Sequence, residues 1–293
     1  MANFRLQPTQ LPFLDNVCIL EAVDQSSASI QLNAQHKLLV KAVGYHLHPT
    51  IIQPHLPAEP KVADLGAGTG TFLVDIANQY PSTAQFDGYD ISDVAWLPPT
   101  ERPANVTLHL TNCKKPPPPA LHGAYDLVTL RFLNSGMGIE DWHPRASHAF
   151  QLLKPGGALQ WIEANFAQVL PILQSHPDAV TSASEKGTVR AMHESPHTDW
   201  FVANLPPILD SLGFHGIKQN VTRTDRLPET RAELSRLFFG ALYGILRRMA
   251  ASGRKDAWTL EEAEEIYAEM LREVDAGAYV TCDLHQFFAF KPL

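Results

Sequence analysis

The sequence predicts an α/β fold: a seven-stranded, mostly parallel sheet with a helical N-terminal segment and a helical cap. Hydrophobic residues make up 45% and charged residues 18% of the 293 residues, which is enough apolar material to bury a sizeable core. From Lys61 onward, short apolar runs alternate with helical stretches, an order that favours parallel strands joined by right-handed crossovers. A glycine-rich turn follows the first run, at the edge where open α/β sheets place their ligands.

The first 57 residues are predicted to form the helical N-terminal segment. Apolar residues recur there at helical spacing, and Pro49 and Pro54 then end the helix. We therefore divide the chain into a segment at 1–57, which caps the sheet or joins two copies, and a domain at 58–293. The apolar residues of this helix are Ile30, Ala34, Leu38, Leu39, Ala42 and Val43.

Seven segments of the remaining chain are predicted to be strands, because each is a short run of apolar or β-branched residues bounded by turn residues. Helical patterns lie between several of them. A late helix opens with Thr259 and Glu262, which have the spacing of a capping box. The predicted strands are 62–65, 84–92, 105–113, 124–133, 158–166, 215–224 and 285–293, and the predicted helices are 71–80, 144–153, 206–214, 234–249 and 259–271.

Two insertions interrupt this alternation, at about 166–205 and about 228–280. Residues 176–200 of the first are polar and rich in serine, threonine and histidine, and we expect them to be irregular. No stretch has the composition of a linker between independent domains. The two insertions are therefore expected to form a lid on the single sheet domain.

Charge and cysteine content exclude several kinds of partner. The net charge is −8 and no basic run stands out, so nucleic acid and anionic membrane are not expected partners. No apolar run reaches the roughly 18 residues that a membrane span needs, and no signal peptide is evident, so we expect a cytoplasmic protein. The three cysteines, Cys18, Cys113 and Cys282, are far apart and predict neither a disulfide framework nor a zinc site.

The glycine-rich turn contains Gly66, Gly68 and Gly70. A dinucleotide fingerprint would need glycine where Thr71 stands, and a phosphate loop would need a lysine after the glycines. The loop therefore lacks a residue that each of these two phosphate-binding motifs requires, and phosphate-bearing ligands are disfavoured. A tight turn without a ligand is the structural alternative.

Two acidic residues flank this turn. Asp64 would repel a phosphate and attract an ammonium group. Asp90, at the end of the second predicted strand, can accept hydrogen bonds from both hydroxyls of a ribose, although it could also cap a helix. A ligand with an amino group, a ribose and no phosphate fits this pair, and S-adenosylmethionine is such a ligand.

Four stretches carry a family resemblance: VADLGAGTG, GYDIS, YDLVTLRFL and LLKPGGALQWIE. They resemble the class I S-adenosylmethionine-dependent methyltransferases, which have a Rossmann-like sheet. The leading stretch LNAQHKLLVKAVGYHLHPTI is similar to the helix that precedes the glycine loop in the fungal secondary-metabolite branch. The resemblance runs from Leu32 to Phe166, nearly half of the chain.

The resemblance implies roles for residues at the ends of the strands. Asn112 stands where the family often has aspartate, and Gln31 where its leading helix often has an arginine for the methionine carboxylate. The implied cofactor contacts are Asp64, Gly66, Ala67, Gly68 and Gly70 at the methionine end, with Gln31; Asp90 at the ribose; Ile91, Asn112 and Cys113 at the adenine; and Leu130, Arg131 and Phe132 on the sulfonium side.

Candidate proton acceptors are Glu163, His143, His193 and His197. Glu163 ends the fifth predicted strand and could instead hold the leading helix, and His143 could cap the helix at Pro144. His193 and His197 are four residues apart, but the intervening Pro196 argues against a helical pair of metal ligands, so no metal is expected.

We therefore expect methyl transfer from S-adenosylmethionine to oxygen or nitrogen of a small acceptor, which the resemblance suggests is a secondary metabolite. The insertions would form the acceptor lid. Two alternatives stay open: a methyltransferase-like pericyclase or cyclase that binds the cofactor without methyl transfer, and a non-catalytic regulatory partner. A homodimer through the N-terminal segment or the late helices is compatible with each.

Overall fold

The structure is a computed structural model that describes residues 25–193 and 199–293. The main sheet has the order β3-β2-β1-β4-β5-β9-β7. The first five of these strands pair in parallel, and β9 runs antiparallel to both β5 and β7. The predicted seven-stranded, mostly parallel sheet is therefore confirmed. Its strands are β1 (Lys61–Leu65), β2 (Gln85–Asp90), β3 (Val106–Leu110), β4 (Tyr125–Arg131), β5 (Leu153–Asn165), β7 (His215–Arg223) and β9 (Asp283–Phe290).

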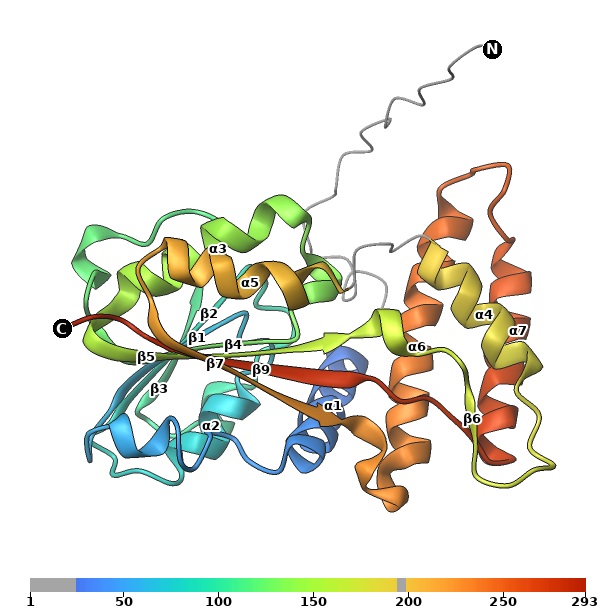
Figure 1. The fold of residues 1–293 in the computed structure, drawn as a ribbon, viewed down its shortest axis with the longest axis horizontal. Coiled ribbons are helices and arrows are strands. Elements are labelled where there is room, and N and C mark those ends of the chain that lie inside the picture. The colour runs from blue at the N-terminus through green and yellow to red at the C-terminus, as the bar shows by residue number, and fades with distance from the viewer. Residues whose placement is uncertain (1–24, 194–198) are drawn as a thin grey trace, which may run out of the picture.

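Helices cover both faces of this sheet (Figure 1). α3 and α5 lie on one face, α1 and α2 lie on the other, and α4, α6 and α7 form a bundle at one end. A small second sheet pairs β6 (Leu173–Gln174) with β8 (Ala278–Tyr279). The helices are α1 (Gln25–Val43), α2 (Thr71–Ala77), α3 (Trp142–Leu152), α4 (Ser182–His193), α5 (Trp200–Ser211), α6 (Arg231–Ala251) and α7 (Leu260–Asp275).

α4 was not predicted, since the polar residues 176–200 were expected to be irregular. Its buried face is made of small residues rather than large apolar ones, so hydrophobic periodicity does not reveal it. The carboxylate of Glu273 on α7 accepts hydrogen bonds from the backbone N–H groups of Ala183 (2.8 Å) and Ser184 (2.7 Å) and so caps α4. The buried small residues of α4 are Ala183, Ser184, Gly187, Thr188 and Ala191.

α7 begins at the predicted capping box. Thr259 Oγ1 accepts a hydrogen bond from Glu262 N–H at 3.1 Å, and Glu262 Oε2 accepts one from Thr259 N–H at 2.7 Å. The helix then packs on α6 and α4 to complete the bundle. Within 25–193 and 199–293, the helices are too short or too polar to cross a bilayer.

The sheet order brings the carboxyl ends of β1, β2 and β4 to one edge. The register pairs Leu65 with Tyr89 on β2 and with Leu130 on β4. The glycine loop, Asp90 and Arg131 therefore follow or end three adjacent strands. α1 lies over this edge: Ser29 Oγ donates to the carbonyl of Ala95 beyond β2 at 3.1 Å.

Candidate functional site

The glycine loop joins β1 to α2 and approaches its neighbours closely. Gly66 has φ +78°, and a Cβ built on it would lie 2.4 Å from a methyl carbon of Leu133. Only glycine fits both the backbone angle and that contact. The N–H groups of Gly66 and Ala67 donate to the carbonyl of Tyr89 at 2.7 and 3.1 Å, which ties the loop to the end of β2.

Asp90 is joined directly to the loop. Its Oδ2 accepts a hydrogen bond from Gly68 N–H at 2.8 Å, and its Oδ1 accepts one from Ser92 N–H at 3.1 Å. Burial raises the pKa of Asp90, while these backbone donors act in the opposite direction. Since a carboxylate oxygen can accept more than one hydrogen bond, Asp90 can still receive hydroxyl groups of a ligand. Ile91, beside it, is half-buried.

Asp64 is buried at the end of β1, with only 1% of its surface exposed. Its Oδ1 accepts a hydrogen bond from Thr129 Oγ1 at 2.6 Å, whereas its Oδ2 has no hydrogen-bond partner. The nearest cation is Arg131, whose Nη2 lies 3.7 Å from that oxygen. Burial raises the pKa of Asp64, and Arg131 and Thr129 counteract the shift.

Arg131 ends β4 and turns its guanidinium toward Asp64. The guanidinium lies 3.7 Å from the ring centre of Phe72, and Nη1 lies 3.3 Å from His36 Nδ1. Its Nε is buried without a hydrogen-bond partner. Burial lowers the pKa of Arg131 while Asp64 acts to raise it, and a guanidinium stays charged in proteins. Leu130, predicted on the sulfonium side, is instead fully buried in the sheet core.

Asn112 and Cys113 follow β3. Asn112 Oδ1 accepts a hydrogen bond from Lys114 N–H at 3.0 Å and so shapes the turn. Cys113 is buried among residues that include Tyr89, and burial raises the pKa of its thiol to about 12. The charge of Arg145 acts to lower this pKa, and the charges of Asp90 and Asp64 act to raise it. The Cys113 thiol is neutral at physiological pH.

Glu163, predicted as a proton acceptor or as a partner of the leading helix, has its hydrogen-bond partners elsewhere in the described structure. It is fully buried inside β5, and its oxygens accept hydrogen bonds from Leu133 N–H (3.0 Å), Asn134 N–H (3.0 Å) and Trp161 Nε1 (2.8 Å). Its partners belong to the loop after β4 and not to the leading helix. A carboxylate with three buried donors has a structural role in holding the loop after β4.

The stability of the protein should depend on the ionisation of Glu163. Burial raises its pKa from 4.5 to about 7, although the hydrogen bonds from its three donors act to lower the pKa. Between these pH values the folded state holds a proton that the unfolded state has lost, so stability should fall as pH rises, by up to about 3 kcal/mol. Urea unfolding at pH 5 and pH 7.5 should show a larger loss for the wild type than for Glu163→Gln. Equal losses in both proteins would contradict this.

Two of the histidines predicted as proton acceptors lie in different parts of the structure. His143 is exposed in the first turn of α3, and His193 is exposed at the last residue of α4, in the bundle. Figure 1 places α3 on the sheet and α4 at its end. His197 lies outside the described residues.

α1 presents different residues to the site than the resemblance implied. Gln31 is exposed, and its Nε2 lies 3.8 Å from a Cβ built on Gly240 of α6. Asn33 and His36 face the site instead: Asn33 Oδ1 accepts hydrogen bonds from the hydroxyls of Thr69 and Thr71. Neither residue was predicted from the sequence to contact the cofactor.

A signal for His36 was present in the sequence. It lies in the apolar stripe of α1, three residues before Leu39 and seven before Val43. His36 is 7% exposed, as buried as its apolar neighbours on that stripe. A histidine at a core position of a helix needs a buried polar partner, and that partner could have been sought near the glycine loop.

The sequence matches a protein family described as "Methyltransferase domain" over residues 63–159, which hold the glycine loop, Asp64, Asp90 and Arg131. The methyltransferase grgD of a Penicillium species is 34% identical over 160 residues, covering 51% of this chain and 53% of that protein. The chain therefore spans about half the length of that curated relative. The N-methyltransferase tcpN of Claviceps purpurea is 26% identical and covers more: 85% of this chain and 89% of that protein.

Other relatives are named as regulators of secondary metabolism and not as methyltransferases. The secondary metabolism regulator laeA of Fusarium oxysporum is 25% identical, over 80% of this chain and 76% of that protein. Among solved structures, phosphoethanolamine N-methyltransferase 2 of Haemonchus contortus in complex with S-adenosyl-L-methionine superposes with a TM-score of 0.51. Identity in that comparison is 14%, over 97% of this chain and 61% of the other, so it shows a shared fold alone.

Proposed function

This chain belongs to the class I S-adenosylmethionine-dependent methyltransferases, and we propose that it transfers the methyl group of S-adenosylmethionine to oxygen or nitrogen of a small secondary-metabolite acceptor. The family uses S-adenosylmethionine as its cofactor. The glycine loop and Asp90 lie on adjacent strand ends and are joined by the hydrogen bond from Gly68 to Asp90. Asp90 would hold the ribose, and Ile91, Asn112 and Cys113 would edge the adenine.

The observation that carries the cofactor assignment is a pair of buried atoms without hydrogen-bond partners. Asp64 Oδ2 lacks a donor, Arg131 Nε lacks an acceptor, and the two side chains approach to 3.7 Å. An α-amino acid group carries an ammonium and a carboxylate on one carbon, so it can satisfy a carboxylate and a guanidinium at once. The methionine moiety of S-adenosylmethionine has this group. Other buried atoms of the described residues, among them Arg102 Nε and Arg145 Nε, also lack a partner, so it is the position of these two beside the glycine loop, with opposite charges, that is informative.

When bound, the cofactor supplies the electrophilic methyl group. This chain's residues would hold the methionine moiety through Asp64 and Arg131, hold the ribose through Asp90, and exclude water with α1 and the loop after β4. Alignment of a nucleophile with the methyl carbon can itself supply up to about 7–11 kcal/mol of the barrier reduction. A base is needed only when the acceptor must lose its proton on attack, and His143 and His193 remain candidates.

The acceptor lid would come from the two insertions, at about 166–205 and 228–280. Aromatic rings of these insertions contact one another: half-buried Phe166 lies 5.3 Å from the buried Phe238, and half-buried Tyr243 stacks on half-buried Tyr267 at 4.4 Å between ring centres. Phe132, directly after Arg131, has φ +57°, a backbone conformation rare for a large residue and found more often at functional sites. A mostly apolar acceptor fits these rings.

Replacement of Asp90, the proposed ribose contact, should weaken cofactor binding while the protein still folds. The Asp90→Ala variant should bind S-adenosylmethionine about tenfold or more weakly, since it loses charge-assisted hydrogen bonds to two hydroxyls. Asp210→Ala, an exposed aspartate on α5, is the matched control and should bind normally. Isothermal titration calorimetry measures both. Absence of binding to the wild type would contradict the proposed function.

A regulatory role is the second candidate, because relatives named secondary metabolism regulators align over four fifths of the chain. The two functions differ in turnover. Incubation with S-adenosylmethionine and extracts containing candidate acceptors should yield S-adenosylhomocysteine in proportion to a methylated product. Cofactor binding without any S-adenosylhomocysteine, together with a stable protein complex, would favour the regulator.

A further inference from the structure

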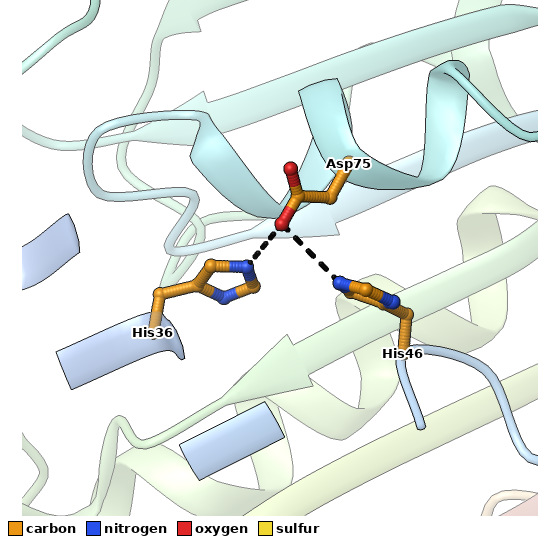
Figure 2. A group of neighbouring side chains, drawn as sticks. All are labelled: His36, His46 and Asp75. Carbon is orange, nitrogen blue, oxygen red and sulfur yellow. Dashed lines mark hydrogen bonds and ion pairs between the residues drawn. The ribbon is translucent and has the colours of Figure 1, made fainter. Parts of the chain in front are cut away.

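Three polar side chains meet behind Arg131, where α1 and the segment after it cross α2. Asp75 Oδ2 lies 2.8 Å from His36 Nε2 and 3.2 Å from His46 Nε2 (Figure 2). The two imidazoles point at the same carboxylate oxygen from different segments, and their ring centres are 5.7 Å apart. The far nitrogen of His36, Nδ1, faces Arg131 Nη1 at 3.3 Å.

These contacts determine the tautomer of His36. Arginine can only donate, so His36 Nδ1 must be the acceptor and carries no proton. Nε2 therefore carries the proton and donates it to Asp75. Burial and the nearby Arg131 lower the pKa of His36 to about 4, which keeps the ring neutral at physiological pH. The chain Asp75–His36–Arg131 is thus a fully oriented set of hydrogen bonds.

The same three side chains could suggest a metal site, because their ligand atoms lie within 4.8 Å of one another. A metal on Nε2 of His36 would move the proton to Nδ1, which would then face the N–H of Arg131. Metal-binding histidines usually donate that other N–H to a carboxylate or carbonyl, whereas here the partner is itself a donor. The contact with Arg131 therefore disfavours a metal at this position.

Arg131 has a competing partner on its other side. Its Nη2 forms an ion pair with Asp64 Oδ2 at 3.7 Å, longer than a hydrogen bond, and arginine readily forms shorter, paired hydrogen bonds with a carboxylate. If the guanidinium moved onto Asp64, each group would satisfy the other. The ammonium and carboxylate of the cofactor would then lose both of their partners. The guanidinium also contacts His36 Nδ1 and lies over the ring of Phe72.

We propose that His36 is a positioning residue that keeps Arg131 from closing this ion pair into paired hydrogen bonds with Asp64, so that Arg131 can bind the methionine carboxylate of S-adenosylmethionine. This inference rests on the proposed function, because it assumes that this cofactor binds here. In this proposal Arg131 binds the methionine carboxylate, a role that the resemblance implied for the position of Gln31. The leading helix contributes a neutral hydrogen-bond acceptor, and the cation comes from the end of β4.

Decarboxylated S-adenosylmethionine, which lacks only the carboxylate, provides the test. We expect the wild type to bind S-adenosylmethionine about 10- to 100-fold more tightly than the decarboxylated compound, the range of a hydrogen bond between charged groups. In His36→Gln, whose amide reaches toward Asp75 but not Arg131, this preference should shrink about fivefold or more, with the affinity for the decarboxylated compound kept within about twofold. His36→Asn, which places an oxygen near the Nδ1 position, should restore most of the preference. Lys37→Ala, an exposed neighbour on α1, is the matched control.

Several results would overturn the inference. An unchanged preference in His36→Gln, or equal losses in His36→Gln and His36→Asn, would show that the acceptor at Nδ1 is not what matters. A loss of preference in Gln31→Ala alone would return the role to Gln31. Micromolar or tighter zinc binding that His46→Ala removes would contradict the tautomer. If the wild type binds neither compound, the proposed function fails rather than this step.

A measurement on the unmodified protein keeps the test independent of how the variants fold. Long-range 15N–1H spectra at neutral pH should show His36 protonated at Nε2 and unprotonated at Nδ1. The Nδ1 resonance should shift on addition of S-adenosylmethionine and shift less with the decarboxylated compound. A protonated Nδ1 in the free protein would overturn the inference.

Discussion

Replacement of Arg131 by methionine is expected to weaken S-adenosylmethionine binding by about 100-fold or more. The substitution keeps a long side chain over Phe72 but removes the cation beside Asp64. A bound carboxylate would then be buried without a donor, and Asp64 would lose its nearby positive charge; unpaired buried charges are costly. Isothermal titration calorimetry measures the loss.

Three comparisons make this prediction specific to the amino-acid end of the cofactor. Binding of 5′-methylthioadenosine, which lacks that end, should change by no more than about threefold in Arg131→Met, since its contacts would be to Asp90 and the adenine side. Arg131→Lys should fall between wild type and methionine, because lysine keeps the charge but not the planar fork. Arg223→Met, an exposed arginine on β7, is the matched control. Parallel losses for both ligands would indicate collapse of the site and contradict the assignment.

The half of the site that lies close together in the chain could be predicted from the sequence. Asp64 and the glycine loop are separated by a few residues, and Asp90 ends the next strand, so local pattern and strand order suffice to place them together. His36 and Arg131 are 95 residues apart, and no periodicity in either segment signals that they touch. Helix packing decides that contact: the face of α1 that turns toward α2 presents His36 rather than Gln31.

The hydrogen-bond partners of Glu163 likewise could not be predicted from the sequence. Its place near the end of β5 was correctly predicted, and strand ends are where catalytic carboxylates are often found. Its function depends on which donors its two oxygens meet, and those donors come from the backbone after β4. Backbone N–H groups are present at every non-proline residue and leave no mark in the sequence. Burial and partner geometry therefore had to come from the structure.

Replacement of Glu163 by leucine is expected to lower the free energy of unfolding by about 3–5 kcal/mol. Leucine fills a similar volume but leaves three buried donors without an acceptor, on Leu133, Asn134 and Trp161. Urea unfolding at neutral pH measures the loss. Glu265→Leu, an exposed glutamate on α7, should change stability by no more than about 0.5 kcal/mol and is the matched control.

Glu163→Gln separates the role of the carboxylate in folding from its role at the site. A glutamine keeps one acceptor oxygen but turns an NH₂ group toward a backbone N–H, so one of the two loop hydrogen bonds should be lost and the protein should still fold. The loop that Glu163 holds contains Leu133, which covers Gly66, and it follows Arg131 directly. Affinity for S-adenosylmethionine should therefore fall by about tenfold in Glu163→Gln under conditions where the protein is fully folded. Unchanged affinity in a folded Glu163→Gln protein, with methyl transfer abolished, would instead restore Glu163 as the catalytic base.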